Sequence, residues 1–134
     1  MMIPEINESG YLPAGIHPAS LSEIDARFGQ QSELRRVQME SIRWMAELAR
    51  EAGVSRIILN GSFVTDIIEP NDVDCVLLIG SEFPNDLAAE SELLNGLPFL
   101  DISMVDDRDF DYFSKQFFAY DRVREPKGML EVVG

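Results

Sequence analysis

The fold is decided by the stretch Ile57-Ile-Leu-Asn-Gly-Ser-Phe-Val-Thr-Asp-Ile-Ile-Glu-Pro-Asn-Asp-Val-Asp-Cys-Val-Leu-Leu-Ile79. Its two ends are apolar runs, 56–59 and 73–79, which predict two strands. Successive side chains of a strand point to opposite faces, so Asp72 and Asp74 are expected to project together. Such paired carboxylates repel each other unless a cation lies between them, and their hard oxygen atoms suit Mg²⁺ or Mn²⁺. The pattern therefore predicts a metal site at Asp72 and Asp74.

Length and composition indicate one ordinary globular domain. The chain has 134 residues, of which 46% are hydrophobic and 26% charged, enough to bury a single core. The apolar runs are too short for a bilayer, so no membrane association is expected. The acidic N-terminus does not resemble a secretory signal, and one cysteine excludes an internal disulfide framework. We therefore expect a cytoplasmic protein.

The net charge of −13 narrows the class of partner. Nucleic-acid binding depends on Lys and Arg that neutralise phosphates, so a nucleic-acid partner is unlikely on this charge balance. A small nucleotide carried in with its metal ion, or a basic protein steered by charge, fits better. The alternative reading is that the acidity only keeps the protein soluble.

Along the chain, two segments are expected. Residues 1–19 hold several Gly and Pro without helical or alternating period, which predicts an irregular arm packed on the domain. Residues 20–134 are expected to form the single domain. Its first helix is expected to be capped by Ser20, which matches a capping box, or by Ser22, and to end at about residue 28. Two more helices are expected at 31–52 and over about ten residues from 85 or 86. Further helices are expected at 63–68 and from 108 to 120, and a last strand at 127–133.

A third carboxylate follows on a later predicted strand, 99–105. Asp101 alternates there with apolar neighbours, and a charge within an apolar strand requires a partner. We therefore expect an α/β (α+β) fold, with a small mixed β-sheet, helices packed on one face, and an acidic metal site at one sheet edge.

These parts together resemble the signature of the nucleotidyltransferase superfamily, the DNA polymerase β-like palm. That signature is an apolar strand, Gly-Ser, a short spacer, Asp-x-Asp opening the next strand, and a third acid later. Here the parts are Gly61-Ser62, nine intervening residues, Asp72-Val73-Asp74 and Asp101. The segments 12–18, 61–65 and 70–74 are also similar to a family of small bacterial nucleotidyltransferase-like proteins.

The resemblance implies roles for six residues. Asp72, Asp74 and Asp101 would be the catalytic residues and the ligands of Mg²⁺ or Mn²⁺. Gly61, Ser62 and Thr65 would bind the nucleotide. The chain departs from the pattern at Asp66, where a basic residue would help to hold a triphosphate.

The implied function is transfer of a nucleoside monophosphate from a nucleoside triphosphate (NTP) such as ATP to a protein or small-molecule acceptor. The size, the acidity and the single palm also suit the antitoxin of a toxin–antitoxin pair. The alternative is a catalytically weak or inactive module of the same fold that binds a basic protein partner, such as a toxin.

Several single features carry plainer interpretations. Arginines 35, 36, 43 and 50 predict a solvated helix face paired with glutamates, in preference to a phosphate or partner site. His17, the sole histidine, is read as a packing residue and not as a base. Cys75 is read as core. Each half of the signature, taken alone, could be only a turn.

Overall fold

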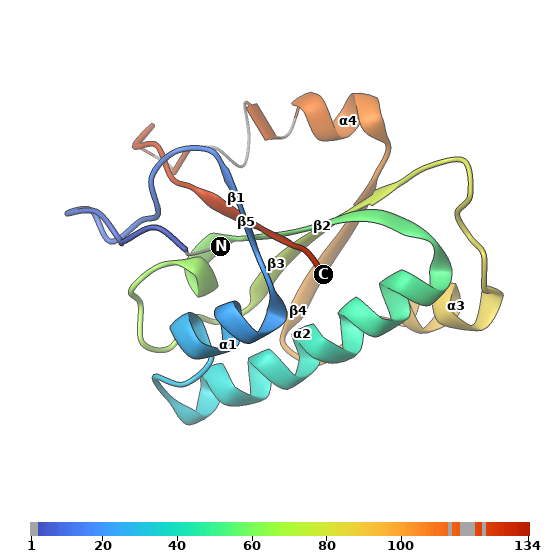
Figure 1. The fold of residues 1–134 in the computed structure, drawn as a ribbon, viewed down its shortest axis with the longest axis horizontal. Coiled ribbons are helices and arrows are strands. Elements are labelled where there is room, and N and C mark those ends of the chain that lie inside the picture. The colour runs from blue at the N-terminus through green and yellow to red at the C-terminus, as the bar shows by residue number, and fades with distance from the viewer. Residues whose placement is uncertain (1–2, 113, 116–119, 122) are drawn as a thin grey trace.

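The protein consists of one β-sheet with helices on both of its faces (Figure 1). The computed structural model describes residues 3–112, 114–115, 120–121 and 123–134. In chain order the elements are β1 (Ile16–Ala19), α1 (Leu21–Phe28), α2 (Glu33–Ala52), β2 (Val54–Asn60), the 3₁₀ helix η1 (Gly61–Val64), β3 (Val73–Ile79), α3 (Leu87–Asn95), β4 (Leu100–Val105), α4 (Asp107–Tyr112) and β5 (Met129–Val132).

The sheet has five strands in the order β1-β5-β2-β3-β4. Strand β2 runs antiparallel to both of its neighbours, β5 and β3. The outer pairs β1–β5 and β3–β4 are parallel. The predicted α+β class with a small mixed sheet is therefore confirmed.

The two faces of the sheet carry cores of different size. Helices α1, α2 and α3 cover one face (Figure 1), where alternate strand residues such as Leu59, Cys75 and Leu77 join the larger core. On the other face Phe110 of α4 packs with Ile58, Val76 and Leu78. The expectation that helices pack on one face holds for α1 to α3, and α4 is an addition on the opposite face.

The predicted irregular arm needs a correction at its end. Residues 16–19 form strand β1, which pairs in parallel with β5, so that Ile16 faces Met129. Pro18 cannot donate a backbone hydrogen bond, which suits β1 because it lies at the edge of the sheet. The preceding residues do pack on the domain as expected, since Leu12 is fully buried.

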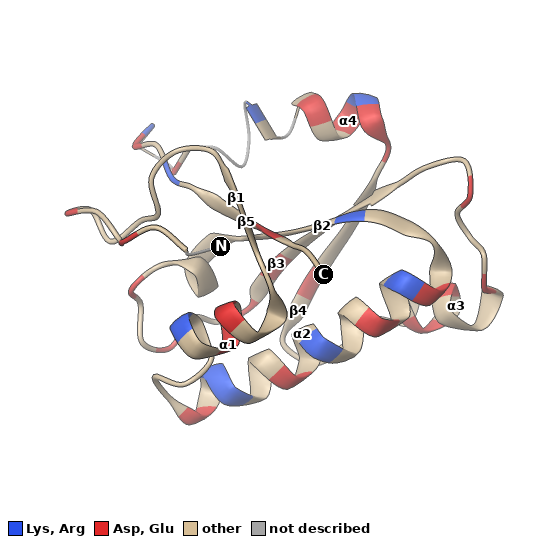
Figure 2. Cartoon of the chain, viewed as in Figure 1, with Lys and Arg blue, Asp and Glu red and all other residues tan. Residues whose placement is uncertain are grey.

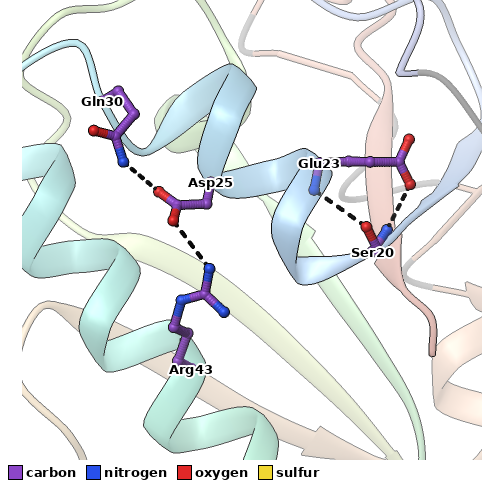
Figure 3. Close-up of polar contacts among 5 residues, drawn as sticks. All are labelled: Ser20, Glu23, Asp25, Gln30 and Arg43. Carbon is purple, nitrogen blue, oxygen red and sulfur yellow. Dashed lines mark hydrogen bonds and ion pairs between the residues drawn. The ribbon is translucent and has the colours of Figure 1, made fainter.

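The helix ends follow the local sequence. Figure 3 shows the capping box of α1, in which the Ser20 hydroxyl accepts from the Glu23 backbone and the Glu23 carboxylate accepts from the Ser20 backbone. The Ser32 hydroxyl caps α2 by accepting from the Arg35 backbone N–H, without the reciprocal bond of a capping box. Figure 3 also shows Asp25 accepting hydrogen bonds from Arg43 and Gln30, which hold the pKa of its carboxyl below the usual range.

Charge is distributed unevenly over the elements. Figure 2 shows acidic positions on every α-helix, with basic positions interleaved along α2.

Within the described part of the chain, no helix has the length and apolar character to cross a bilayer. The predicted helix at 108–120 is present as α4 up to Tyr112, while residues 113 and 116–119 of that prediction lie outside the described residues.

Candidate functional site

Strand β3 separates its side chains between the two faces of the sheet as the sequence predicts. Val73, Cys75 and Leu77 are buried in the larger core. Burial raises the pKa of the Cys75 thiol, which fits its predicted place in the core. Asp74 lies on the opposite face and is half-buried. Asp72 is exposed, directly before the strand begins.

Asp101 is brought beside Asp74 by the parallel pairing of β3 with β4. The two residues are register partners, and neighbouring strands lie about 4.8 Å apart. Both side chains therefore leave the sheet on the same face. Asp101 itself is exposed because β4 is an edge strand, so it does not carry the buried charge that the sequence suggested.

The electrostatics of Asp74 connect the three carboxylates. Burial raises the pKa of Asp74, and the negative charge of Asp101 raises it further. Lys127 lowers this pKa, whereas Asp72 raises it. A carboxyl group in such surroundings gains most when a cation approaches, because the cation offsets both the burial and the repulsion.

The Gly61-Ser62 turn lies directly against Asp74. Gly61 has φ +78°, and a Cβ built on it would lie 2.2 Å from the Asp74 Oδ2 atom. Only glycine combines this backbone conformation with room for the carboxylate. The turn continues as η1 and ends at Val64, so the helix predicted at 63–68 begins earlier and is shorter.

Thr65 serves the loop and not an open site. Its hydroxyl donates to the Ser62 carbonyl at 2.7 Å and accepts from the Ile67 backbone N–H at 3.2 Å. The residue is 6% exposed. Of the three predicted nucleotide-binding residues, the structure places Gly61 against the Asp74 carboxylate, with Ser62 next to it in the chain, and gives Thr65 a structural role.

Two buried side chains of α2 hold the loops of the site, and the sequence interpretation missed both. Arg35 is 1% exposed and donates to the carbonyl oxygens of Phe63 and Thr65, at 2.7 and 3.0 Å. Gln38 donates to the Pro70 carbonyl at 2.7 Å, in the turn before Asp72. The solvated face predicted for the arginines of α2 is therefore wrong for Arg35. Hydrogen bonds from a charged donor are worth about 1.5–3 kcal/mol each, so these contacts fix the loop.

Asn60 is a further residue of the site. It ends β2 and is the register partner of Asp74, so its side chain leaves the sheet on the same face. It is 2% exposed, and its Oδ1 atom has no hydrogen-bond partner among the described residues. A buried acceptor without a partner costs about 1–3 kcal/mol. The signal in the sequence is a polar residue that directly follows an apolar strand.

Lys127 supplies positive charge at the same place. In the antiparallel pairing of β2 with β5, Ile58 faces Glu131 and Leu59 faces Leu130. Extending this register would bring Lys127 opposite Ser62. The influence of Lys127 on the pKa of Asp74 agrees with this position. A basic residue from a distant part of the chain thus acts on Asp74, although none follows Gly-Ser in the sequence.

The donor set of the site is oxygen-rich. Within the described residues, no three carboxylate, histidine or cysteine side chains are gathered closely enough to hold a metal ion as they stand. The neighbouring carboxylates of Asp74 and Asp101, together with the unpaired oxygen of Asn60, are nevertheless the kind of hard donor that Mg²⁺ and Mn²⁺ prefer.

Fold and site together define a small α+β domain whose mixed sheet carries neighbouring carboxylates beside a glycine turn. The chain belongs to the Family of unknown function (DUF6932), whose family model matches residues 4–133. Comparison with curated proteins and with solved structures gave no match.

Proposed function

We propose that this protein is a metal-dependent nucleotidyltransferase that transfers a nucleoside monophosphate from an NTP to a protein or small-molecule acceptor. The observation that carries the proposal is the pairing of Asp74 with Asp101, directly against the Gly61-Ser62 turn. Carboxylates beside a Gly-Ser turn are the arrangement that the sequence resemblance to the superfamily implies.

Each residue of the site has a task in this reaction. Asp72, Asp74 and Asp101 would hold Mg²⁺ or Mn²⁺, and their oxygen donors and the raised pKa of Asp74 fit such an ion. When bound, the ion supplies charge stabilisation for the triphosphate. At Gly61 the missing Cβ leaves room for the Asp74 carboxylate, so the turn and the carboxylate lie in contact, and the turn would face the phosphates of an NTP whose ion Asp74 holds. Lys127 adds positive charge near the same turn.

The transfer itself exchanges one P–O bond for another. An acceptor hydroxyl forms the bond to the α-phosphorus, and the bond to the β-phosphate oxygen breaks, which releases pyrophosphate. Asp101 is exposed and can therefore accept the proton of the incoming hydroxyl. Positioning and charge stabilisation account for most of the catalysis in reactions of this class.

The kind of acceptor follows from the charge of the chain. A net charge of −13 disfavours a nucleic-acid acceptor and favours a basic protein. We infer a cytoplasmic protein, with the antitoxin half of a toxin–antitoxin pair as the role that size and acidity suit.

A second function, a module that binds a basic protein partner without catalysis, is favoured by two observations at the loop. The Thr65 hydroxyl is engaged in hydrogen bonds within the loop, to Ser62 and Ile67. The exposed Asp66 follows it, where a basic residue would help to hold a triphosphate. Such a module would keep its affinity for the partner after loss of the site carboxylates.

Calorimetric titration of ATP, GTP, CTP and UTP, with and without Mg²⁺, tests the proposal. The wild type is compared with Asp72→Asn/Asp74→Asn. The matched control is Glu40→Gln/Glu51→Gln, which makes the same charge change on exposed positions of α2. We expect binding that requires Mg²⁺, survives in the control and is lost in the site variant. A folded wild type that binds no nucleotide would refute the enzyme proposal and leave the binding module.

A further inference from the structure

No interaction within the described fold explains why a polar side chain is buried at Asn60. It is 2% exposed, its oxygen has no hydrogen-bond partner, and no side-chain hydrogen bond joins it to any residue that the structure describes. An apolar side chain of similar size would fill the same space without leaving an unsatisfied acceptor. Buried polar groups are normally paired, and an exception points to a group that the chain itself does not supply.

The surroundings of Asn60 indicate what that group is. Across the strand pair its register partner is Asp74, whose own neighbour is Asp101. When the carboxylates are ionised, all of these oxygens are acceptors. Lys127 is near enough to lower the pKa of Asp74, but it forms no hydrogen bond or ion pair with these oxygens within the described ranges of the chain. The acceptors on this face therefore still lack a partner, which a divalent cation would supply. The amide oxygen is neutral, so it adds a ligand without adding to the repulsion that raises the pKa of Asp74.

Gln38 provides a useful contrast, because its side-chain oxygen is the other buried acceptor without a partner in the described part of the chain. Its amide nitrogen donates to the Pro70 carbonyl at 2.7 Å, so the fold explains its presence. Asn60 has no such bond, and its side chain leaves the sheet on the face that carries Asp74 and Asp101.

We propose that Asn60 is a ligand residue of the site, whose side-chain oxygen binds the same divalent cation as the Asp74 carboxylate. This inference rests on the proposed function, because that function supplies the ion, and it adds a ligand that the Asp-x-Asp pattern does not contain. Mg²⁺ and Mn²⁺ accept amide oxygens alongside carboxylates.

The test measures the affinity for Mn²⁺ and Mg²⁺ by calorimetry, without nucleotide, and the urea midpoint in EDTA. Asn60→Leu removes the oxygen and keeps the branched shape of the side chain with somewhat more bulk, and Asn60→Val removes the oxygen with less bulk than leucine. We expect the affinity of both variants for Mn²⁺ to fall by about tenfold or more, while the urea midpoint of at least one of them in EDTA stays equal to that of the wild type or rises, because no hydrogen bond is lost. Asn60→Asp keeps an oxygen ligand, so it should retain Mn²⁺ binding but lower the midpoint in EDTA through added repulsion.

The results separate this inference from the proposed function. If the wild type binds Mn²⁺ and Asn60→Leu binds it equally well, Asn60 is not a ligand and the enzyme proposal is unaffected. If Asn60→Leu and the smaller Asn60→Val are both destabilised or unfolded in EDTA, the amide has a structural role, such as donation to Asp74, and the inference is overturned. If the wild type binds neither ion, both proposals fail.

Discussion

The contact between Gly61 and Asp74 allows a quantitative prediction about Gly61→Ala. A Cβ at this position would lie 2.2 Å from Asp74 Oδ2 and 3.0 Å from Asp74 Cγ. The distance to Asp74 Cβ is 3.4 Å, which is an ordinary contact. The clash is therefore with the carboxyl group alone, and removing that group should relieve it.

Two costs add in the single variant. The positive φ of +78° costs an alanine about 1–2 kcal/mol. Displacing the carboxyl group from its place costs about another 1–3 kcal/mol, as in other overpacked sites. We expect Gly61→Ala to lower the free energy of unfolding by about 2–5 kcal/mol in total.

A double-mutant cycle in urea separates the two costs. In an Asp74→Ala background the backbone strain remains and the clash disappears, so Gly61→Ala should cost only about 1–2 kcal/mol. Gly15→Ala is the control for strain alone, because Gly15 has φ +112° and no atom within 4 Å of its built Cβ. Unfolding midpoints and m-values would be measured for all variants.

The reasoning is refuted if Gly61→Ala costs the same in both backgrounds. That result would mean that the carboxyl group does not occupy the space beside Gly61. The carbonyl and amide groups of the turn would then be placed differently relative to Asp74, and the observation behind the proposed function would be lost.

Three further predictions concern charged side chains. Arg35→Met should lower the free energy of unfolding by more than about 3 kcal/mol in urea, because it removes several buried hydrogen bonds. The control Arg36→Met should change it by less than about 0.5 kcal/mol. Equal effects would contradict the conclusion that Arg35 holds the loop. Because the pKa of Asp25 is lowered in the folded state, its pairing stabilises the protein above the unfolded pKa and is lost as pH falls through the folded value. Asp25→Asn should therefore lower stability by about 0.2–1 kcal/mol at pH 7, and urea midpoints should show this difference shrinking towards pH 3. Lys127→Met should weaken binding of MgATP by about two- to fivefold in calorimetry, with Lys115→Met as the charge-matched control; no difference between the two would remove Lys127 from the site.

The predictable parts of the fold are those that depend on local periodicity. The alternation along β3 indicated correctly which side chains enter the core and which face carries Asp74. The capping box at Ser20 placed the start of α1. The structure brings Gly61 of the Gly-Ser pair against Asp74 of the Asp-x-Asp segment.

The parts that the sequence did not predict depend on contacts between distant segments. Arg35 lies in a helix rich in arginine and glutamate, which is the pattern of a solvated face. Its burial arises only when residues 63–67 fold over it. Strand β1 has a proline and no alternation, and it becomes a strand because β5 pairs with it. Lys127, just before β5, comes near enough to lower the pKa of Asp74 because β5 pairs beside β2, a long-range pairing that no local pattern encodes.

The position of β5 has a consequence for how the protein folds. This last strand lies between β1, near the start of the chain, and β2. During synthesis β1 therefore has no partner strand until residues 129–132 of β5 have left the ribosome. Contacts of such large sequence separation slow folding, because the chain loses entropy before the contacts form. We expect the α2–β2–β3–β4 part to assemble first and the insertion of β5, with β1 beside it, to be the late and rate-limiting event.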